Sequence, residues 1–225
     1  MINSLSVNVL IPIGDENPSR IFPIINWSII ILCFLIFLWQ MSGGQGFFEW
    51  TLNTYGIIPV KALDQESFYS FITNIFLHGG WSHLLGNMLF LFVFGDNVED
   101  RLGHLRYILF YLICGVGASA VWMVTELDGL IPAVGASGAI SGVLGAYFVL
   151  YPYAKIRTLM GFGYFTRVVR VPAWAMIGMW FFYQLILSFL PYNTGVAYWA
   201  HVGGFVIGWI ISRFFKQRYD PFSYR

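Results

Sequence analysis

Gly135-Ala136-Ser137-Gly138-Ala139-Ile140-Ser141-Gly142 is a run of small or short residues that opens an apolar segment continuing to Tyr151. Small residues at positions i, i+4 and i+8 of a membrane helix allow a second backbone to come close. Two stripes of this kind lie side by side here: Ser137, Ser141 and Gly145, and next to them Gly138, Gly142 and Ala146. The run therefore has two interpretations. It is either a helix-packing surface or a glycine-flanked turn that holds a serine nucleophile, Ser137, at a helix N-terminus.

The composition indicates a membrane protein. Of the 225 residues, 58% are hydrophobic and 10% are charged, so there are too few charged side chains to cover a soluble surface of this size. The net charge is +1, and the absence of a basic patch with interleaved aromatic residues argues against nucleic acid as a partner. Both cysteines, Cys33 and Cys114, lie in apolar runs and are expected to pack as small hydrophobic side chains. The expected partner of this apolar protein is the lipid bilayer.

Apolar segments of sufficient length predict six membrane-spanning helices, at about 21–40, 82–98, 104–124, 137–152, 172–190 and 197–215. The sequence thus predicts an all-α, polytopic membrane domain over residues 21–215. Residues 1–20 are expected to form a short polar segment and residues 216–225 a tail, and no signal peptide is evident. The connection 41–77 is rich in aromatic residues, so we expect it to lie in the membrane interface.

The basic residues predict the orientation. With the N-terminus in the cytoplasm, eleven of the twelve Lys and Arg residues fall on the inner side and only Lys61 falls outside. Both termini are therefore expected in the cytoplasm, and the protein is expected to be an integral, multi-pass protein of a prokaryotic plasma membrane. The predicted helices 82–98, 137–152 and 197–215 then all begin in the outer half of the membrane.

Those three helix beginnings carry the polar residues of interest. His83 and Asn87 are four residues apart and share one helix face, while His201 continues into a stripe formed by Gly204 and Gly208. Contact between this stripe and the one that begins at Ser137 would bring the serine and His201 to the same level.

The depth of this site follows from helix length. Residues 137–152 give about 24 Å of helix, which is shorter than a hydrocarbon core of about 30 Å. We therefore expect residues 129–136 to dip into the membrane beside a cavity that contains water.

Other classes of site fit the sequence less well. The predicted spans contain no His-Glu-x-x-His pair and no Cys or carboxylate at ligand spacing, so no metal and no cofactor are expected. A haem between His83 and His201 stays open as an alternative. A transporter would show an internal repeat or paired broken helices, and we find neither. Glu99-Asp100-Arg101 is expected to close the second helix with a local ion pair, and His104 is expected to be solvated.

Three motifs, in this order, resemble those of the rhomboid intramembrane serine proteases. They are His78-Gly79-Gly80-Trp81-Ser82-His83 with Asn87, Gly135-Ala136-Ser137-Gly138, and Ala200-His201-x-x-Gly204-x-x-x-Gly208. The resemblance covers residues 21–215 and implies the six-helix prokaryotic form of the fold. Glu99-x-Arg101-Leu102-Gly103 is similar to the family signature at the end of the second helix. The first loop departs from the family pattern, because Trp50 is followed by Thr51 where an arginine is often found.

The resemblance implies a role for each site residue. Ser137 would be the nucleophile and His201 its general base, in a dyad without an acidic residue. The oxyanion would be bound by the Ser137 backbone N–H and the side chains of His83 and Asn87. Supporting positions would be His78, Gly135, Gly138, Gly204 and Gly208.

The resemblance also implies a substrate class. Substrates would be single-span membrane proteins that are cut near the outer end of their helix. They would reach the site laterally, past residues 172–190, and residues 191–196 would form a mobile cap. The alternative is a catalytically silent relative that binds membrane helices through the same small-residue grooves.

Overall fold

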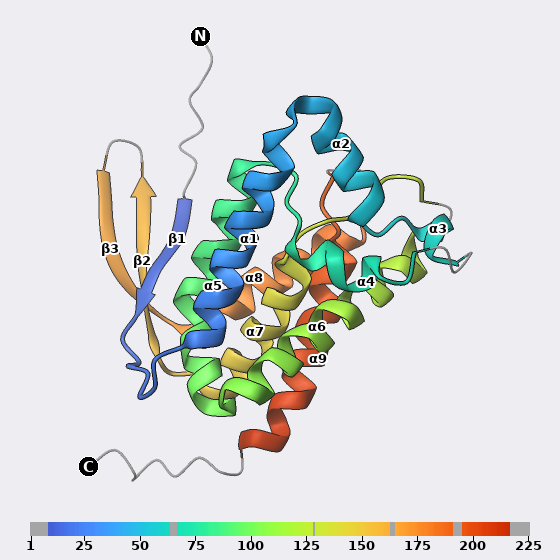
Figure 1. Ribbon diagram of the computed structural model, residues 1–225. Coiled ribbons are helices and arrows are strands. Elements are labelled where there is room, and N and C mark those ends of the chain that lie inside the picture. Colours follow the sequence, from blue (N-terminus) through green and yellow to red (C-terminus); the bar gives the residue numbers. More distant parts are fainter. Residues whose placement is uncertain (1–8, 64–66, 128, 163–164, 191–194, 217–225) are drawn as a thin grey trace.

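The computed structural model describes residues 9–63, 67–127, 129–162, 165–190 and 195–216. Figure 1 shows a helical bundle with a small sheet on one flank. The helices are α1 (Ile24–Ser42), α2 (Gly44–Tyr55), α3 (Pro59–Leu63), α4 (Ser70–Thr73), the 3-10 helix η1 (Asn74–Phe76), α5 (Trp81–Leu102), α6 (His104–Thr125), α7 (Ser137–Leu150), α8 (Ala173–Ser188) and α9 (Tyr198–Lys216). The strands are β1 (Val9–Asp15), β2 (Lys155–Phe162) and β3 (Phe165–Pro172).

Each predicted span corresponds to one helix, namely α1, α5, α6, α7, α8 or α9, with ends that differ by a few residues. Among the described helices, α1 and α6 are long and apolar enough to cross a membrane, and α7 and α8 are shorter apolar helices. The mostly helical fold is therefore confirmed, whereas the number of spans stays a prediction. Of the predicted tail 216–225, all but Lys216 lies outside the described residues.

Helix α7 lies at the centre of the bundle, between α5, α6 and α9 (Figure 1). Every residue of α7 except Ser137 and Phe148 is buried, as expected for a helix that is apolar on all sides. Glycines bring α7 and α9 together: a Cβ on Gly204 would lie 2.0 Å from the carbonyl oxygen of Gly138, and one on Gly208 would lie 2.1 Å from that of Gly142. The two backbones are therefore in direct contact.

The prediction of an all-α fold is wrong at one place. Strands β1, β2 and β3 form an antiparallel sheet in the order β1-β2-β3, with Asp15 opposite Ile156 and Lys155 opposite Pro172. Alternate side chains of β2 point inward and outward, since Ile156 and Thr158 are buried while Arg157 is exposed. No element was predicted between the spans 137–152 and 172–190, because the basic residues there were weighed for orientation and this alternation was not.

The sheet also corrects the expectation for residues 1–20. This segment contributes β1, which contacts α5, while β2 and β3 contact the beginning of α8. Asp15 at the end of β1 accepts hydrogen bonds from the Tyr147 hydroxyl of α7 and from the Asn97 amide of α5. The N-terminal segment is therefore joined to the bundle by polar contacts.

The connection 41–77 contains the helical elements α2, α3, α4 and η1. Its aromatic rings pack on one another and on the end of α1: Trp39 lies against Phe47, and Phe47 is stacked on Trp50 at 5.3 Å between ring centroids. The Trp50 side chain is also largely exposed. The location of this connection in the membrane interface stays a prediction.

The carboxylate of Glu99 has a longer-range role than the expected local ion pair. It is fully buried and accepts hydrogen bonds from the backbone N–H groups of Ile25 and Asn26, at 2.9 and 2.7 Å. These groups belong to the first turn of α1, whose N–H groups have no partner within the helix. His104, expected to be solvated, contacts the same carboxylate through Nδ1 at 2.5 Å. Glu99 therefore caps α1 from the end of α5.

Candidate active site

The turn before α7 requires a glycine at position 135. Gly135 has a φ of +132°, a conformation that other residues rarely adopt. A Cβ at this position would also lie 2.6 Å from Nε2 of His83. The N–H of Gly135 donates to the carbonyl of Asn74 at 2.9 Å, which holds the turn against η1. Ser137 is consequently the first residue of α7, where the backbone N–H groups lack helical partners.

Ser137 and His201 are in hydrogen-bond contact. Oγ of Ser137 lies 2.8 Å from Nε2 of His201, and this contact joins the first turns of α7 and α9. The glycine contacts described above bring the two helices close enough for it. The second serine of the run, Ser141, is fully buried and donates to the carbonyl of Ser137 at 2.6 Å. Its hydroxyl is thus engaged in a hydrogen bond within α7. Ser137 is the serine that faces a base.

His83 and Asn87 converge on the Gly135 turn from α5. The N–H of Gly79 donates to Nδ1 of His83 at 3.4 Å, which leaves Nε2 as the protonated nitrogen, directed at Gly135. Nδ2 of Asn87 lies 3.6 Å from the position of a Cβ on Gly135. Within the part of the chain that the structure describes, this buried Nδ2 has no hydrogen-bond partner. Two side-chain donors therefore point at the turn that precedes Ser137.

His78 lies behind His83 and not at the surface. Its side chain is fully buried, and the two imidazole rings meet edge to face with 5.2 Å between their centroids. The backbone of His78 is held by Gln40 of α1, whose amide accepts from its N–H at 3.1 Å and donates to its carbonyl at 3.3 Å. His78 therefore supports the orientation of His83 by packing.

The structure adds one residue that the sequence analysis missed. Oε1 of Gln184, on α8, lies 2.8 Å from Nδ1 of His201. The sequence carried a signal for it, because Gln184 is an amide within the otherwise apolar run of α8, and polar residues inside membrane segments commonly have functional roles. Only the lack of an acidic partner for the histidine was inferred from the sequence, and an amide partner was not predicted.

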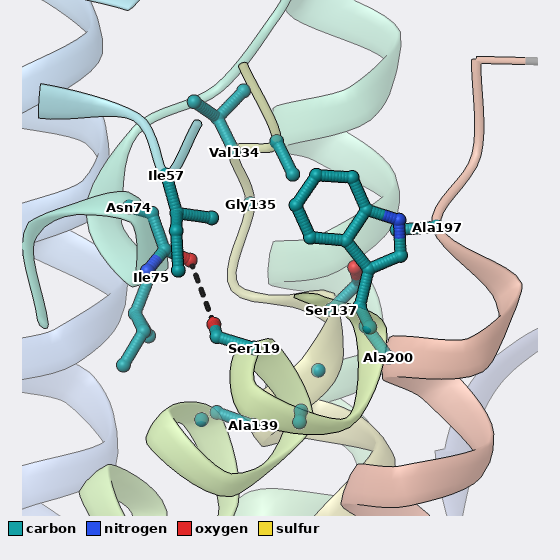
Figure 2. A pocket seen from close by; sticks show the side chains of 15 residues that line it. Ile57, Asn74, Ile75, Ser119, Val134, Gly135, Ser137, Ala139, Ala197 and Ala200 are labelled. Carbon is teal, nitrogen blue, oxygen red and sulfur yellow. Dashed lines mark hydrogen bonds between the residues drawn. The ribbon is translucent and has the colours of Figure 1, made fainter. Parts of the chain in front are cut away.

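A small cavity of about 30 Å³ adjoins Ser137. Figure 2 shows Ser137 and Ala200 on one side of it and Asn74 and Ser119 on the other, the latter two joined by a hydrogen bond of 3.3 Å. This volume can hold a water molecule, and the polar groups present can bind one. A larger hollow of about 450 Å³ adjoins it, between residues 129–133, the end of α8 and the beginning of α9.

Among the described residues, no group of three or more His, Cys, Asp and Glu side chains could hold a metal ion. His201 is directed at Ser137 and His83 is directed at Gly135. Both nitrogens that a haem would need therefore face the serine turn, and the arrangement favours chemistry at Ser137 over binding of a haem.

Comparison with known proteins places this site within a recognised domain. The family model described as the rhomboid domain matches residues 65–218, which include every candidate site residue. The rhomboid-family protein YdcA of Bacillus subtilis is 27% identical to the chain over 207 residues, covering 89% of this chain and 94% of YdcA.

Two further relatives are more similar over shorter regions. Rhomboid-like protein 11, chloroplastic, of Arabidopsis thaliana is 33% identical over 66% of this chain and 54% of its own length. Rhomboid protease GluP of Bacillus subtilis is 36% identical over 58% of this chain and 25% of its own length. The chain spans about a third to a half of the length of the Arabidopsis relatives that it matches.

Proposed function

Because this chain belongs to the rhomboid family of membrane proteins, we propose that it is an intramembrane serine endopeptidase that cleaves transmembrane segments of single-span membrane proteins. The observation that carries the proposal is the 2.8 Å contact between Oγ of Ser137 and Nε2 of His201. A hydroxyl is a weak nucleophile unless an adjacent base takes its proton. The contact supplies that base at the partly exposed first residue of a mostly buried helix.

The proposed reaction proceeds by acyl transfer. Nε2 of His201 accepts the proton of Ser137 while Oγ attacks the carbonyl carbon of the peptide bond, and the resulting imidazolium then protonates the leaving amine. A water molecule hydrolyses the acyl-enzyme, with His201 again as the base. The cavity beside Ser137 offers a place for this water.

Negative charge on the substrate oxygen would be stabilised at the Gly135 turn. The donors there are the backbone N–H of Ser137, Nε2–H of His83 and Nδ2–H of Asn87, and the positive end of the α7 dipole adds to them. The unpartnered Nδ2 of Asn87 supports this role. A buried donor without a partner costs stability, so its presence indicates a function that needs the free N–H group.

Substrates would reach the dyad laterally, past α8. This helix buries few of its side chains, namely Ala173, Ile177 and Gln184, and exposes large apolar ones such as Phe182 and Tyr183. An apolar substrate helix would find a compatible surface there. Of the predicted cap 191–196, residues 191–194 lie outside the described residues.

We place the protein in a prokaryotic plasma membrane, with six spans and both termini in the cytoplasm. The distribution of basic residues supports this orientation, and the similarity to two Bacillus subtilis proteins supports the prokaryotic membrane. Ser137 would then lie toward the outer face, and cleavage would occur near that face.

The competing function is that of a catalytically silent rhomboid-like protein that binds membrane helices. The experiment that separates the two is labelling of the detergent-solubilised protein with a fluorophosphonate, followed by mapping of the modified residue by mass spectrometry. We expect a single adduct on Ser137, formed equally well in EDTA. A protein that is folded yet unlabelled would favour the silent binder, and labelling that requires added zinc would contradict the dyad.

A further inference from the structure

The two ring nitrogens of His201 contact side chains on two different helices. Nδ1 lies 2.8 Å from Oε1 of Gln184 while Nε2 lies 2.8 Å from Oγ of Ser137, so α8, α9 and α7 meet at one imidazole. Gln184 is 7% exposed and shares the inward face of α8 with Ala173 and Ile177. Its amide is thus enclosed within the bundle.

The proton on His201 must be on Nδ1 for the dyad to work. Nε2 can accept the Ser137 proton only if it carries none, and in a neutral imidazole the other nitrogen then carries the hydrogen. The carbonyl oxygen of Gln184 is positioned to accept this Nδ1–H. A neutral amide also avoids the cost of burying a charged carboxylate in apolar surroundings.

We propose that Gln184 is a positioning residue that fixes the tautomer and ring orientation of His201 from α8. This inference rests on the proposed protease function and adds to it a link between α8 and the general base. Trp180 and Tyr198 also lie near the imidazole, at 6.1 and 6.3 Å between ring centroids, and they confine the ring by packing.

The two ends of α8 are held differently, and this affects the contact between Gln184 and His201. The beginning of the helix is held by backbone hydrogen bonds of 2.9 Å, from Ala173 to Ala154 and from Trp174 to Pro152. Its other end borders the hollow of about 450 Å³, which Leu187 and Ser188 help to line. A movement of that end would displace Gln184, so His201 is aligned only while α8 lies against α9.

The test compares Gln184→Met with Gln184→Glu. Methionine keeps the length of the side chain but has no carbonyl acceptor, whereas glutamate keeps an acceptor oxygen at the same place. For Gln184→Met we expect kcat and the rate of fluorophosphonate labelling of Ser137 to fall about 10- to 100-fold, by analogy with the loss seen when the partner that orients a metal-bound histidine is removed. KM should stay unchanged, and Gln184→Glu should recover most of the rate. The melting temperature of Gln184→Met should fall slightly, because the buried Nδ1–H of His201 loses its acceptor.

Gln45→Met is the matched control, because it makes the same change at an exposed glutamine of α2, outside the site. It should label at the rate of the unmodified protein. Nitrogen-15 NMR of histidine-labelled protein gives a readout without turnover: we expect His201 to be protonated at Nδ1, and Gln184→Met to populate both tautomers.

Three results would overturn the inference. Gln184→Met could label and turn over at the original rate, Gln184→Glu could be as slow as Gln184→Met, or His201 could be protonated at Nε2 in the unmodified protein. The first two leave the protease function standing if the unmodified chain labels, whereas protonation at Nε2 would also contradict His201 as the base for Ser137. An unmodified chain that neither labels nor cleaves overturns the proposed function, and the inference with it.

Discussion

The two ends of the bundle use buried polar residues in opposite ways. At the end where α7 begins, which we call the serine end, Asn87 and His78 have side-chain nitrogens without partners among the described residues. At the other end is a cluster that we call the Glu99 network, formed by the buried side chains of Glu99, Asn26 and Tyr107, with the exposed His104 at its edge. There the hydroxyl of Tyr107 donates to Oδ1 of Asn26 at 2.8 Å, and Nδ2 of Asn26 donates to the carbonyl of Leu91 at 3.0 Å.

Paired and unpaired buried polar groups are expected to have different effects on stability and on turnover. A buried network whose donors and acceptors are all paired stabilises the fold and defines one arrangement. A buried donor left unpaired costs stability, and at the serine end the unpaired Nδ2 of Asn87 points to the turn where a substrate oxygen would develop charge. Variants at the serine end should therefore lower turnover, and variants in the Glu99 network should lower the free energy of unfolding.

The largest effect is expected at the nucleophile. Ser137→Ala should lower kcat by about 10⁵-fold or more, because the reaction loses the atom that forms the acyl intermediate. The melting temperature should hardly change, since Ser137 is only partly buried, at the first residue of α7. Cleavage of a single-span substrate in proteoliposomes measures the loss. Ser141→Ala is the matched control and should keep most of the activity; an inactive Ser141→Ala beside an active Ser137→Ala would reverse the assignment.

Asn87→Ala should lower kcat by about 10²- to 10³-fold, the usual effect of removing one oxyanion donor, and leave the melting temperature unchanged. Asn26→Ala is its counterpart in the Glu99 network, where the same residue type has both ends of its amide paired. That variant should melt earlier and keep its kcat. If Asn87→Ala instead melted earlier with an unchanged kcat, the amide would be a helix bridge and the comparison between the two ends would fail.

Glu99→Gln tests the Glu99 network directly. The glutamine amide brings a donor to a place where two backbone N–H groups already donate, so one buried donor loses its partner. We expect the free energy of unfolding to fall by about 2–3 kcal/mol, as measured by denaturation in mixed detergent micelles. The kcat of the folded protein should be unchanged. Loss of kcat at full stability would show that the two ends are coupled through α5.

The smallest effect concerns pH. Burial raises the pKa of the Asp15 carboxyl from 3.8 to about 6, opposed by the Tyr147 hydrogen bond and reinforced by Asp96. The folded state therefore holds this proton more tightly than the unfolded chain, and the contribution of Asp15 to stability increases as the pH falls from about 6 toward 3.8. Between pH 7 and pH 5 the unmodified protein should gain about 2 °C in melting temperature relative to Asp15→Asn. Equal changes in both proteins would contradict this.

The sequence was sufficient for the class of the protein and for its motifs. Apolar segments of membrane length and the scarcity of charge indicate a helical membrane protein, because lipid leaves few other ways to satisfy the backbone. Ser137, His83, Asn87 and His201 were recognised because residue type and helical spacing are local properties. The order of their motifs was specific enough to suggest the rhomboid family, which the match to residues 65–218 confirms.

What the sequence left open depends on contacts between residues far apart in the chain. The sheet joins Asp15 to Ile156, Glu99 caps a helix that begins 75 residues earlier at Ile24, and Gln184 meets the imidazole of His201 from a separate helix. A side chain that can bond in several directions, such as an amide or a buried carboxylate, acquires its partner only when the helices pack. Composition and spacing thus determined which residues could do chemistry, and the tertiary structure decided which of them are paired for stability and which remain available to a substrate.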